Sequence, residues 1–265
     1  MRAVAVPPAA VASLLASLLA LSACERPPAS ANANADSAAA KGIEADVRYL
    51  ADDKLEGRET GTRGYDLAAD YVAKRYAQIG LTPAGDNGTF FQSVPLLKAT
   101  REPDGAAFEI ARGGRTIALR FKDQFLPALN YNAPSHAVRA PAVFVGQGVH
   151  APELGHDDFA GIDIKGKIAV VFSGAPAKFD NDRRAFYSSS REKLRALAEH
   201  GAIGVVIVST ADDEAKSPWS RSAETWARPG MRLRGSDGKG IDTYPQLQAM
   251  AYVSAAAADL VFADG

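Results

Sequence analysis

Apolar residues recur at helical spacing between residues 43 and 79. The first run consists of Ile43, Val47, Leu50, Ala51 and Leu55. A second run extends from Tyr65 to Ile79, and Gly80 follows it, where the C-terminus of a helix favours glycine. Positions three and four residues apart lie on one face of an α-helix, so both runs predict amphipathic helices. Residues 55–64 between them contain three glycines and are predicted to form a loop.

From about residue 106 the pattern changes to the alternation that is typical of strands. Apolar residues alternate over 108–110 and again over 117–121, on the two sides of Gly113 and Gly114. Two alternating segments around a Gly-Gly pair predict a β-hairpin. Short, β-branched runs follow at 143–145, 168–172 and 202–208, and such runs are typical of strands buried within a sheet.

One helix is predicted between the last two of these strands. Leu194, Leu197 and Ala198 share a helix face, and Gly201 closes the helix. The order strand, helix, strand from 168 to 208 predicts one crossover unit. The polar segment 212–240 holds both tryptophans, Trp219 and Trp226, and is predicted to be a long loop. The pattern leaves open whether the tryptophans face a substrate or pack internally.

The first 40 residues have the character of an export signal and a tether. Arg2 precedes an apolar run over 11–21, which is shorter than a membrane-spanning helix. The sequence Leu21-Ser22-Ala23-Cys24 resembles the lipobox of bacterial lipoproteins, in which the cysteine becomes the acylated N-terminus. We therefore predict a lipoprotein signal peptide at 1–23 and lipidation of Cys24; the alternative is an ordinary secretory signal with an incidental cysteine.

The segment that follows Cys24 has no large apolar residue to bury. Residues 25–40 are rich in Ala, Asn, Ser and Pro, so 24–40 is predicted to be a flexible linker. The protein is then expected to be exported and held by its lipid at a bacterial membrane, on the periplasmic or outer-membrane face.

Composition excludes several classes of function. Hydrophobic residues make up 47% of the 265 residues, which is enough for a packed core. The net charge is -1, with 30 Lys and Arg against 31 Asp and Glu, so no nucleic-acid partner is indicated. A single cysteine rules out an internal disulfide and a cysteine-rich zinc cluster.

Several motifs occur in an order that resembles one peptidase family. They are Leu55-Glu56-Gly57-Arg58 with Thr60-Gly61-Thr62 and Gly64, Ala68-Ala69-x-Tyr71, Ile79-Gly80-Leu81-x-Pro83, Phe91-Gln92, His156-Asp157-Asp158-Phe159, the run 164–171, and 193–201 with 202–206. Together they are similar to the M28 family of zinc peptidases, in the bacterial branch that carries a protease-associated (PA) domain. The resemblance extends from about residue 43 to residue 208.

The resemblance implies a mixed α/β fold. A helical N-terminal segment of a peptidase domain is expected at 41–100. A PA domain, a β-sandwich or barrel with flanking helices, is expected at 101–265. In the family a catalytic domain packs on the segment that corresponds to 43–79, so this domain is the expected partner of those helices.

The resemblance also implies an exported aminopeptidase that removes N-terminal residues from peptides with two zinc ions. In the family the His and Asp/Glu ligands follow the PA domain, and the sequence ends at Gly265 before that region. No catalytic residue, metal ligand or cofactor is therefore predicted within this chain, which is expected to be inactive alone. The alternative is a non-catalytic, lipid-anchored PA-domain module that binds peptides or proteins.

A few residues remain as candidates for chemistry. Arg58 and Glu59, in the glycine-containing loop, are candidates to lie near a substrate, although solvated surface charges are the ordinary interpretation. His150 and His156 with Asp157 and Asp158 could hold a metal, but Pro152 and Gly155 place them on a loop, which favours solvated side chains.

Two further patterns are rejected. The spacing Gly161-x-x-x-x-Gly166-Lys167 matches a P-loop only superficially, because Ile168 follows where the Mg²⁺-binding hydroxyl is required. A serine hydrolase is not indicated because no Gly-x-Ser-x-Gly motif is present, and Ser190 is interpreted as a helix N-cap.

Overall fold

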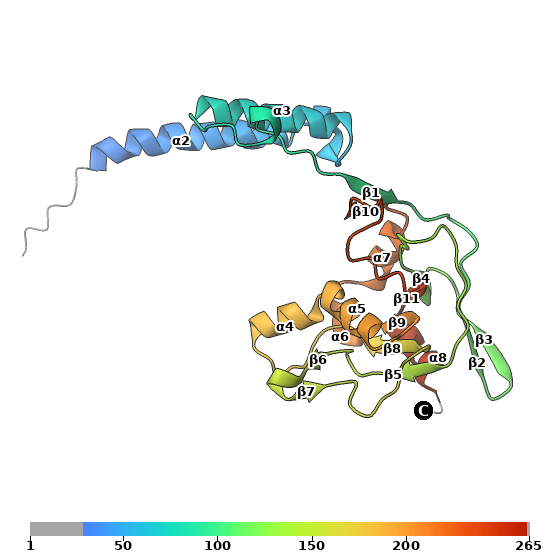
Figure 1. Cartoon of the computed structure of the whole chain (residues 1–265). Helices are drawn as coiled ribbons and strands as arrows, with labels where there is room; N and C mark the ends of the chain where they lie inside the picture. The colour runs from blue at the N-terminus through green and yellow to red at the C-terminus, as the bar shows by residue number, and fades with distance from the viewer. Residues whose placement is uncertain (1–28, 264–265) are drawn as a thin grey trace, which may run out of the picture. The chain divides into compact units, whose positions relative to one another are not determined.

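The computed structural model describes residues 29–263, with side chains from residue 37 onward. The chain divides into two compact units, Met1–Ser93 and Val94–Gly265, shown in Figure 1. The predicted signal peptide 1–23 and Cys24 lie outside the described residues. Among the residues that are described, no helix is long and apolar enough to cross a membrane.

The first unit contains the two predicted helices. They are α2 (Ala29–Leu50) and α3 (Arg63–Gln78), with the 3-10 turns η1 (Asp53–Arg58) and η2 (Asp86–Gly88) after each of them. The Thr62 side chain accepts a hydrogen bond from the Tyr65 N–H at the start of α3. At its end Gly80 adopts a φ of 81° and donates to the carbonyl of Ala77, which confirms the predicted C-terminal glycine.

A polar contact joins α2 to α3. The Tyr71 hydroxyl donates to Asp46 over 2.6 Å, and Arg75 Nε lies 2.8 Å from the same carboxylate. These two donors hold the pKa of Asp46 below its usual range. Tyr49 stacks on Tyr71 with ring centroids 3.9 Å apart. The two helices are thus joined by specific polar and aromatic side chains.

The predicted flexible linker is wrong for its described part, because α2 begins at Ala29. Alanine occupies seven of the twelve positions from 29 to 40, and neither glycine nor proline interrupts them. Alanine has the highest helix propensity, so this segment can continue the helix that follows it in the chain.

The second unit is built on a five-stranded sheet with the order β4-β11-β9-β8-β5. Its strands are β4 (Phe125–Pro127), β5 (Ala142–Phe144), β8 (Ile168–Phe172), β9 (Gly204–Val208) and β11 (Ala249–Val253). The four strands β11, β9, β8 and β5 run parallel, and β4 is antiparallel to β11. The three predicted strand runs are therefore confirmed, and β8 and β9 are neighbours as the crossover prediction requires.

Both faces of the sheet are covered. Ala169, Val171, Val205 and Ile207 share a core with Leu197 of α5 (Ser190–Glu199). Val170 and Val206, the residues between them, point to the other face and share a second core with Leu119 and the C-terminal segment 257–262. Alternate residues of one strand thus enter different cores, which explains why these strands are apolar throughout.

Helices and three small ladders complete the unit (Figure 1). The helices are α4 (Asn181–Ser188), α6 (Ala211–Lys216), α7 (Trp219–Thr225) and α8 (Ala258–Phe262), with the turns η3 (Pro152–Leu154) and η4 (Ala255–Ala257). The ladders pair β1 (Leu96–Ala99) with β10 (Gly230–Leu233), β2 (Glu109–Arg112) with β3 (Arg115–Ala118), and β6 (His150–Ala151) with β7 (His156–Asp157). The predicted hairpin is confirmed, with Gly113 and Gly114 at φ of 55° and 73°.

Several sequence-based expectations about this unit need correction. The sandwich or barrel is not confirmed, since the described strands form one open sheet and small ladders. The segment 212–240 is not a loop, because it contains most of α6, all of α7 and β10. The boundary lies after Ser93 rather than after residue 100, because β1 pairs with β10 of the second unit. The N-cap of α5 is Ser189 rather than Ser190.

Gly64 offers a test of the packing in the first unit. A Cβ at this position would lie 1.8 Å from the carbonyl oxygen of Leu55, so Gly64→Ala is expected to destabilise α3 by about 1–3 kcal/mol. Gly42→Ala is the matched control, because its Cβ would approach no atom closer than 3.5 Å, and it should stabilise α2 by about 0.5–1 kcal/mol. Hydrogen exchange of the α3 amides in the full chain measures the difference, and equal protection in both variants would contradict the close approach.

Candidate functional site

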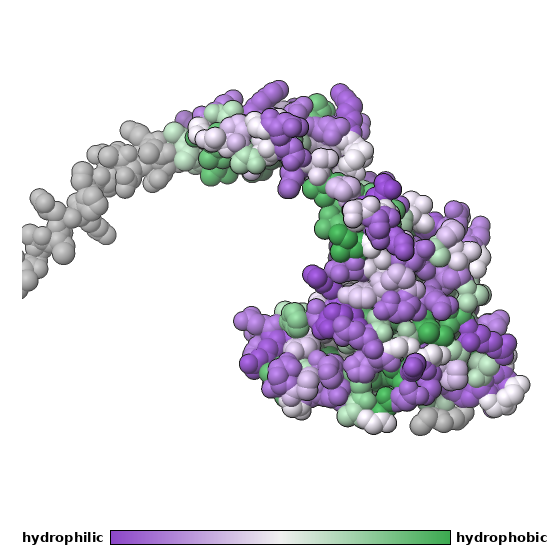
Figure 2. Space-filling view, viewed as in Figure 1, coloured by the Kyte–Doolittle hydropathy of each residue, from purple (hydrophilic) through white to green (hydrophobic). Residues whose placement is uncertain are grey.

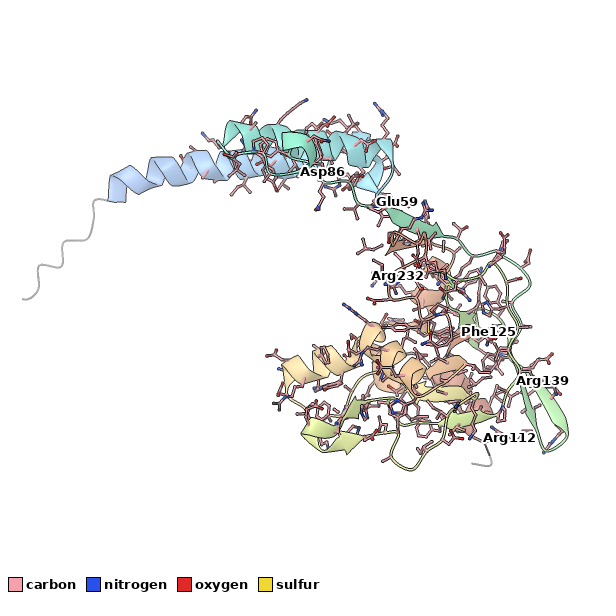
Figure 3. The ribbon with its side chains drawn as sticks, in the orientation of Figure 1. Glu59, Asp86, Arg112, Phe125, Arg139 and Arg232 are labelled. Carbon is pink, nitrogen blue, oxygen red and sulfur yellow. The ribbon has the colours of Figure 1, made fainter. Side chains whose placement is uncertain are left out.

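Arg58 and Glu59 lie where η1 ends and the chain approaches α3 (Figure 3, in which Glu59 is labelled). Both side chains are exposed, and Arg58 has a φ of 58°. The carbonyl of Glu59 accepts hydrogen bonds from the Thr62 N–H and hydroxyl, at 3.1 and 2.7 Å. The backbone here starts the helix, and the proximity of either side chain to a substrate stays a prediction.

The histidines and aspartates around residue 155 form a short ladder rather than the predicted loop. His150 Nδ1 lies 3.1 Å from Asp157 Oδ1, across the ladder of β6 and β7. His156 Nε2 lies 3.1 Å from Asp158 Oδ1, but this approach lacks the alignment of a hydrogen bond. The four residues thus form two separate pairs. No group of three metal-ligating side chains occurs within the described part of the chain.

Asp158 is partly buried and holds the loop that follows β5. Its Oδ2 accepts hydrogen bonds from the N–H groups of Gln147 and Val149, each over 3.0 Å. A Cβ at Gly146 would lie 2.6 Å from Oδ1, so the loop can approach the carboxylate only because residue 146 has no side chain. The interpretation of Asp158 as a solvated loop acid is therefore wrong.

Lys193 holds the same loop from the opposite side. It belongs to α5, is only 4% exposed, and donates through Nζ to the carbonyls of Gln147 and Gly174. Burial lowers the pKa of Lys193 to about 8, and the negative charge of Asp158 opposes part of that shift. Asp158 therefore binds the N–H of Gln147 while Lys193 binds its carbonyl. We call Asp158, Lys193 and residues 146–149 the loop clamp.

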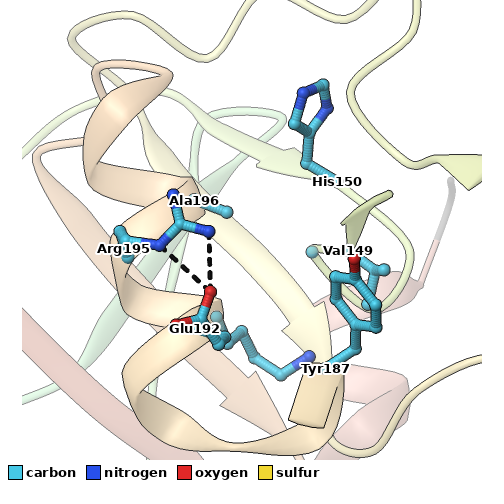
Figure 4. A pocket seen from close by; sticks show the side chains of 8 residues that line it. Val149, His150, Tyr187, Glu192, Arg195 and Ala196 are labelled. Carbon is cyan, nitrogen blue, oxygen red and sulfur yellow. Dashed lines mark hydrogen bonds and ion pairs between the residues drawn. The ribbon is translucent and has the colours of Figure 1, made fainter. Parts of the chain in front are cut away.

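A small pocket lies beside the loop clamp (Figure 4). Its lining includes Lys193, Tyr187 of α4, and Glu192 and Arg195, which form an ion pair of 2.6 Å. The Lys193 amine is already engaged by two carbonyls, so it is not presented to this pocket as a free amine. The arrangement is that of a backbone clamp, and it does not resemble a catalytic lysine.

Polar residues also gather where the parallel strands end, the edge at which open α/β sheets commonly bind ligands. Ser173 donates to Asp213 over 2.6 Å, and the Thr210 N–H donates to the same oxygen over 2.9 Å. Burial raises the pKa of Asp213, but these hydrogen bonds outweigh it and lower the pKa overall. The polar groups of Ser173, Thr210 and Asp213 thus hydrogen-bond to one another at this edge of the sheet.

The tryptophans pack internally rather than forming a rim. Trp226 is buried, donates through its indole N–H to the carbonyl of Pro127 over 2.8 Å, and lies edge-on to Phe121. Trp219, half-buried, donates to the carbonyl of Lys122 over 2.8 Å. Both anchor segment 211–226 to residues 121–127, the segment that ends in β4.

Sequence reasoning missed the loop clamp, although one signal was present. Lys193 precedes Ala196 and Leu197 by three and four positions, so it lies on the buried face of its helix. A charged residue at a position where the pattern requires an apolar one indicates a buried, hydrogen-bonded cation.

The pH dependence of stability tests the state of Lys193. Its folded pKa of about 8 lies below that of an ordinary lysine, so the unfolded chain binds the proton more tightly. Stability should therefore rise from pH 8 toward pH 10, by up to about 3 kcal/mol at about 1.4 kcal/mol per pKa unit. Urea unfolding measures the effect, and Lys193→Met should lack this rise. A flat profile in the parent chain would contradict the lowered pKa.

Comparison with known proteins identifies part of the second unit. The family model of the PA domain matches residues 138–241. No curated protein matches the chain. Among solved structures, the aminopeptidase from Aneurinibacillus sp. strain AM-1 is 18% identical with a TM-score of 0.39, over 85% of this chain and 42% of that one. This chain thus spans less than half of that protein's length. The family match over residues 138–241 confirms the PA domain that the resemblance predicted, and this range includes β5, β8, β9, α5 and the loop clamp.

Proposed function

We propose that the chain is the N-terminal and PA-domain part of an exported, M28-like zinc aminopeptidase that removes N-terminal residues from peptides. The observation that carries this proposal is the PA domain at 138–241, preceded by the glycine-containing loop and helix α3 in the order of that family. The PA domain would shape access of peptides to a catalytic domain whose residues lie beyond Gly265.

Exposed apolar side chains on the first unit support the proposal that another domain packs against this unit. Ile43 and Val47, one turn apart on α2, are 63% and 60% exposed. Ile79, Leu81 and Phe91 are also exposed. Burying each such side chain contributes about 1.5–3 kcal/mol, and a group of them is typical of a surface that another domain covers. A catalytic domain packed on residues 43–79 would supply that cover.

The described residues do not fit the two zinc ions of the proposed enzyme. They contain no cluster of three suitable ligands, and both His–Asp pairs serve the β6–β7 ladder and the loop clamp. In the proposed enzyme the zinc ligands would therefore come from outside the described residues. In this proposal the described residues would contribute the PA domain and an apolar surface for docking of the catalytic domain.

Purified chain should show no aminopeptidase activity on amino-acyl anilides, with or without added Zn²⁺. The reason is that metal-assisted hydrolysis needs ligands that the described residues lack. A longer gene product, read past Gly265 and carrying a His-x-Asp motif with further acids, is the positive control. Zinc-dependent turnover by the 265-residue chain would refute the assignment of its catalytic centre to another segment.

We also propose that Cys24 carries a lipid that anchors the protein to a bacterial membrane. The lipobox-like sequence before Cys24 supports this proposal. Each buried acyl CH₂ contributes about 0.8 kcal/mol, so multiple acylation is needed for firm anchoring. Labelled palmitate fed to the native bacterium should appear on the protein and not on Cys24→Ala. Label on the variant would eliminate Cys24 as the site.

The second candidate is a non-catalytic, lipid-anchored PA-domain module that binds peptides or proteins. It is favoured by the second unit, which covers both faces of its own sheet within residues 94–265. A stop codon directly after Gly265 in the gene would favour this candidate. A continuing frame with the metal-binding motif favours the peptidase.

A further inference from the structure

Two histidines of the second unit lie next to each other, although they come from segments that are distant in the chain. His150 belongs to β6, and His200 is the C-cap residue of α5. Their ring centres are 5.2 Å apart. Phe159 stacks on one face of His200 at 3.9 Å and lies 6.3 Å from His150. A ring over the opposite face of His200 would lie much farther from Phe159, so His150 approaches the edge of His200, where the nitrogens are.

The two rings leave the same nitrogen available for a ligand. His200 Nδ1 lies 2.8 Å from the carbonyl oxygen of Ala196, which can only accept, so this nitrogen carries the proton. His150 Nδ1 lies 3.1 Å from Asp157 Oδ1, and a carboxylate favours the proton on the nearer nitrogen. Each neutral ring therefore has its lone pair at Nε2. Histidines that bind metals typically have their other nitrogen held by a carbonyl or a carboxylate in this way.

The electrostatic surroundings favour a cation beside these rings. The pKa of Asp157 is held below its usual range, chiefly by the His150 side chain and to a smaller extent by the charge of His200. His200 also lies at the C-terminus of α5, where the helix dipole is negative. Arg195, labelled with His150 in Figure 4, already forms ion pairs with two glutamates, so its charge is largely neutralised.

We propose that the Nε2 atoms of His150 and His200 bind one divalent transition-metal ion of the Zn²⁺ class. Imidazole suits zinc, copper and nickel. Two imidazoles on one tetrahedral zinc, with Zn–N bonds of about 2.0–2.1 Å, have ring centres about 5 Å apart. The observed separation of 5.2 Å agrees with that geometry. The ion joins β6 to the end of α5, so its role is to stabilise the fold.

This site is separate from the two zinc ions of the proposed enzyme and does not rest on that function. Both ligands lie within the PA-domain match at 138–241. The described residues supply no third protein ligand, so the ion is held more weakly than a structural zinc with four. The His150 side chain is 42% exposed, and the face of the second unit seen in Figure 2 is mainly hydrophilic. Water molecules can therefore complete the coordination.

Titration of the full, untagged chain with Zn²⁺ tests the proposal, in a Cys24→Ala background that removes the single thiol. Isothermal titration calorimetry should show one ion bound per chain. The Tm should rise with Zn²⁺, because an ion that binds only the folded state stabilises it. His150→Gln and His200→Gln should each weaken binding by about tenfold or more and abolish the rise in Tm.

Two further histidines provide controls. His136→Gln should change nothing, because this exposed residue contacts the Asn130 side chain and lies on another segment. His156→Gln should likewise leave Zn²⁺ binding intact, since its ring is paired with Asp158. Circular dichroism without metal checks that each variant is folded.

Several outcomes would overturn the proposal. Failure of the parent chain to bind Zn²⁺, or undiminished binding by either His150→Gln or His200→Gln, would eliminate the shared site. Equal weakening in His136→Gln would show adventitious binding to surface histidines. Loss of binding in His156→Gln but not in His200→Gln would place the ion between the other two histidines and remove the role of α5.

Discussion

The second unit depends on the burial of β8 and β9 from both sides. Their alternate residues enter two cores, one closed by α5 and the other by Leu119 and the segment 257–262. Because the strands are fixed on both faces, they support the neighbouring strand β5, and the loop that follows β5 contains Gln147. Asp158 and Lys193 can then hold Gln147 by its N–H and its carbonyl. The cost of burying the lysine is met by those two carbonyls and by the nearby carboxylate.

Local sequence patterns predict an element correctly where its burial pattern or its turn residues are neighbours in the chain. The β-branched runs of β8 and β9, the Gly113-Gly114 turn and the helix before Gly201 were all predicted from such patterns. The PA domain was predicted from motif order, and the match over 138–241 confirms it.

Other features depend on partners that are distant in the chain. β1 and β10 are separated by well over one hundred residues, so no local pattern indicates their pairing or the boundary at Ser93. β11 has the sequence Ala-Met-Ala-Tyr-Val, which is poor in β-branched residues, and it becomes a strand because β9 and β4 flank it. The loop clamp was missed for the same reason, since its lysine and aspartate meet only in the folded unit.

The position of β11 has a consequence for how this protein is divided for experiments. The strand lies between β4 and β9, yet both β4 and β11 fall outside residues 138–241. A recombinant fragment cut at the limits of the family match would leave β9 as an open edge. That edge consists of Gly204–Val208, five buried residues in the intact unit. Uncovered apolar edges pair readily with other chains, so such a fragment would be prone to aggregate. A soluble fragment should therefore include both β4 and β11.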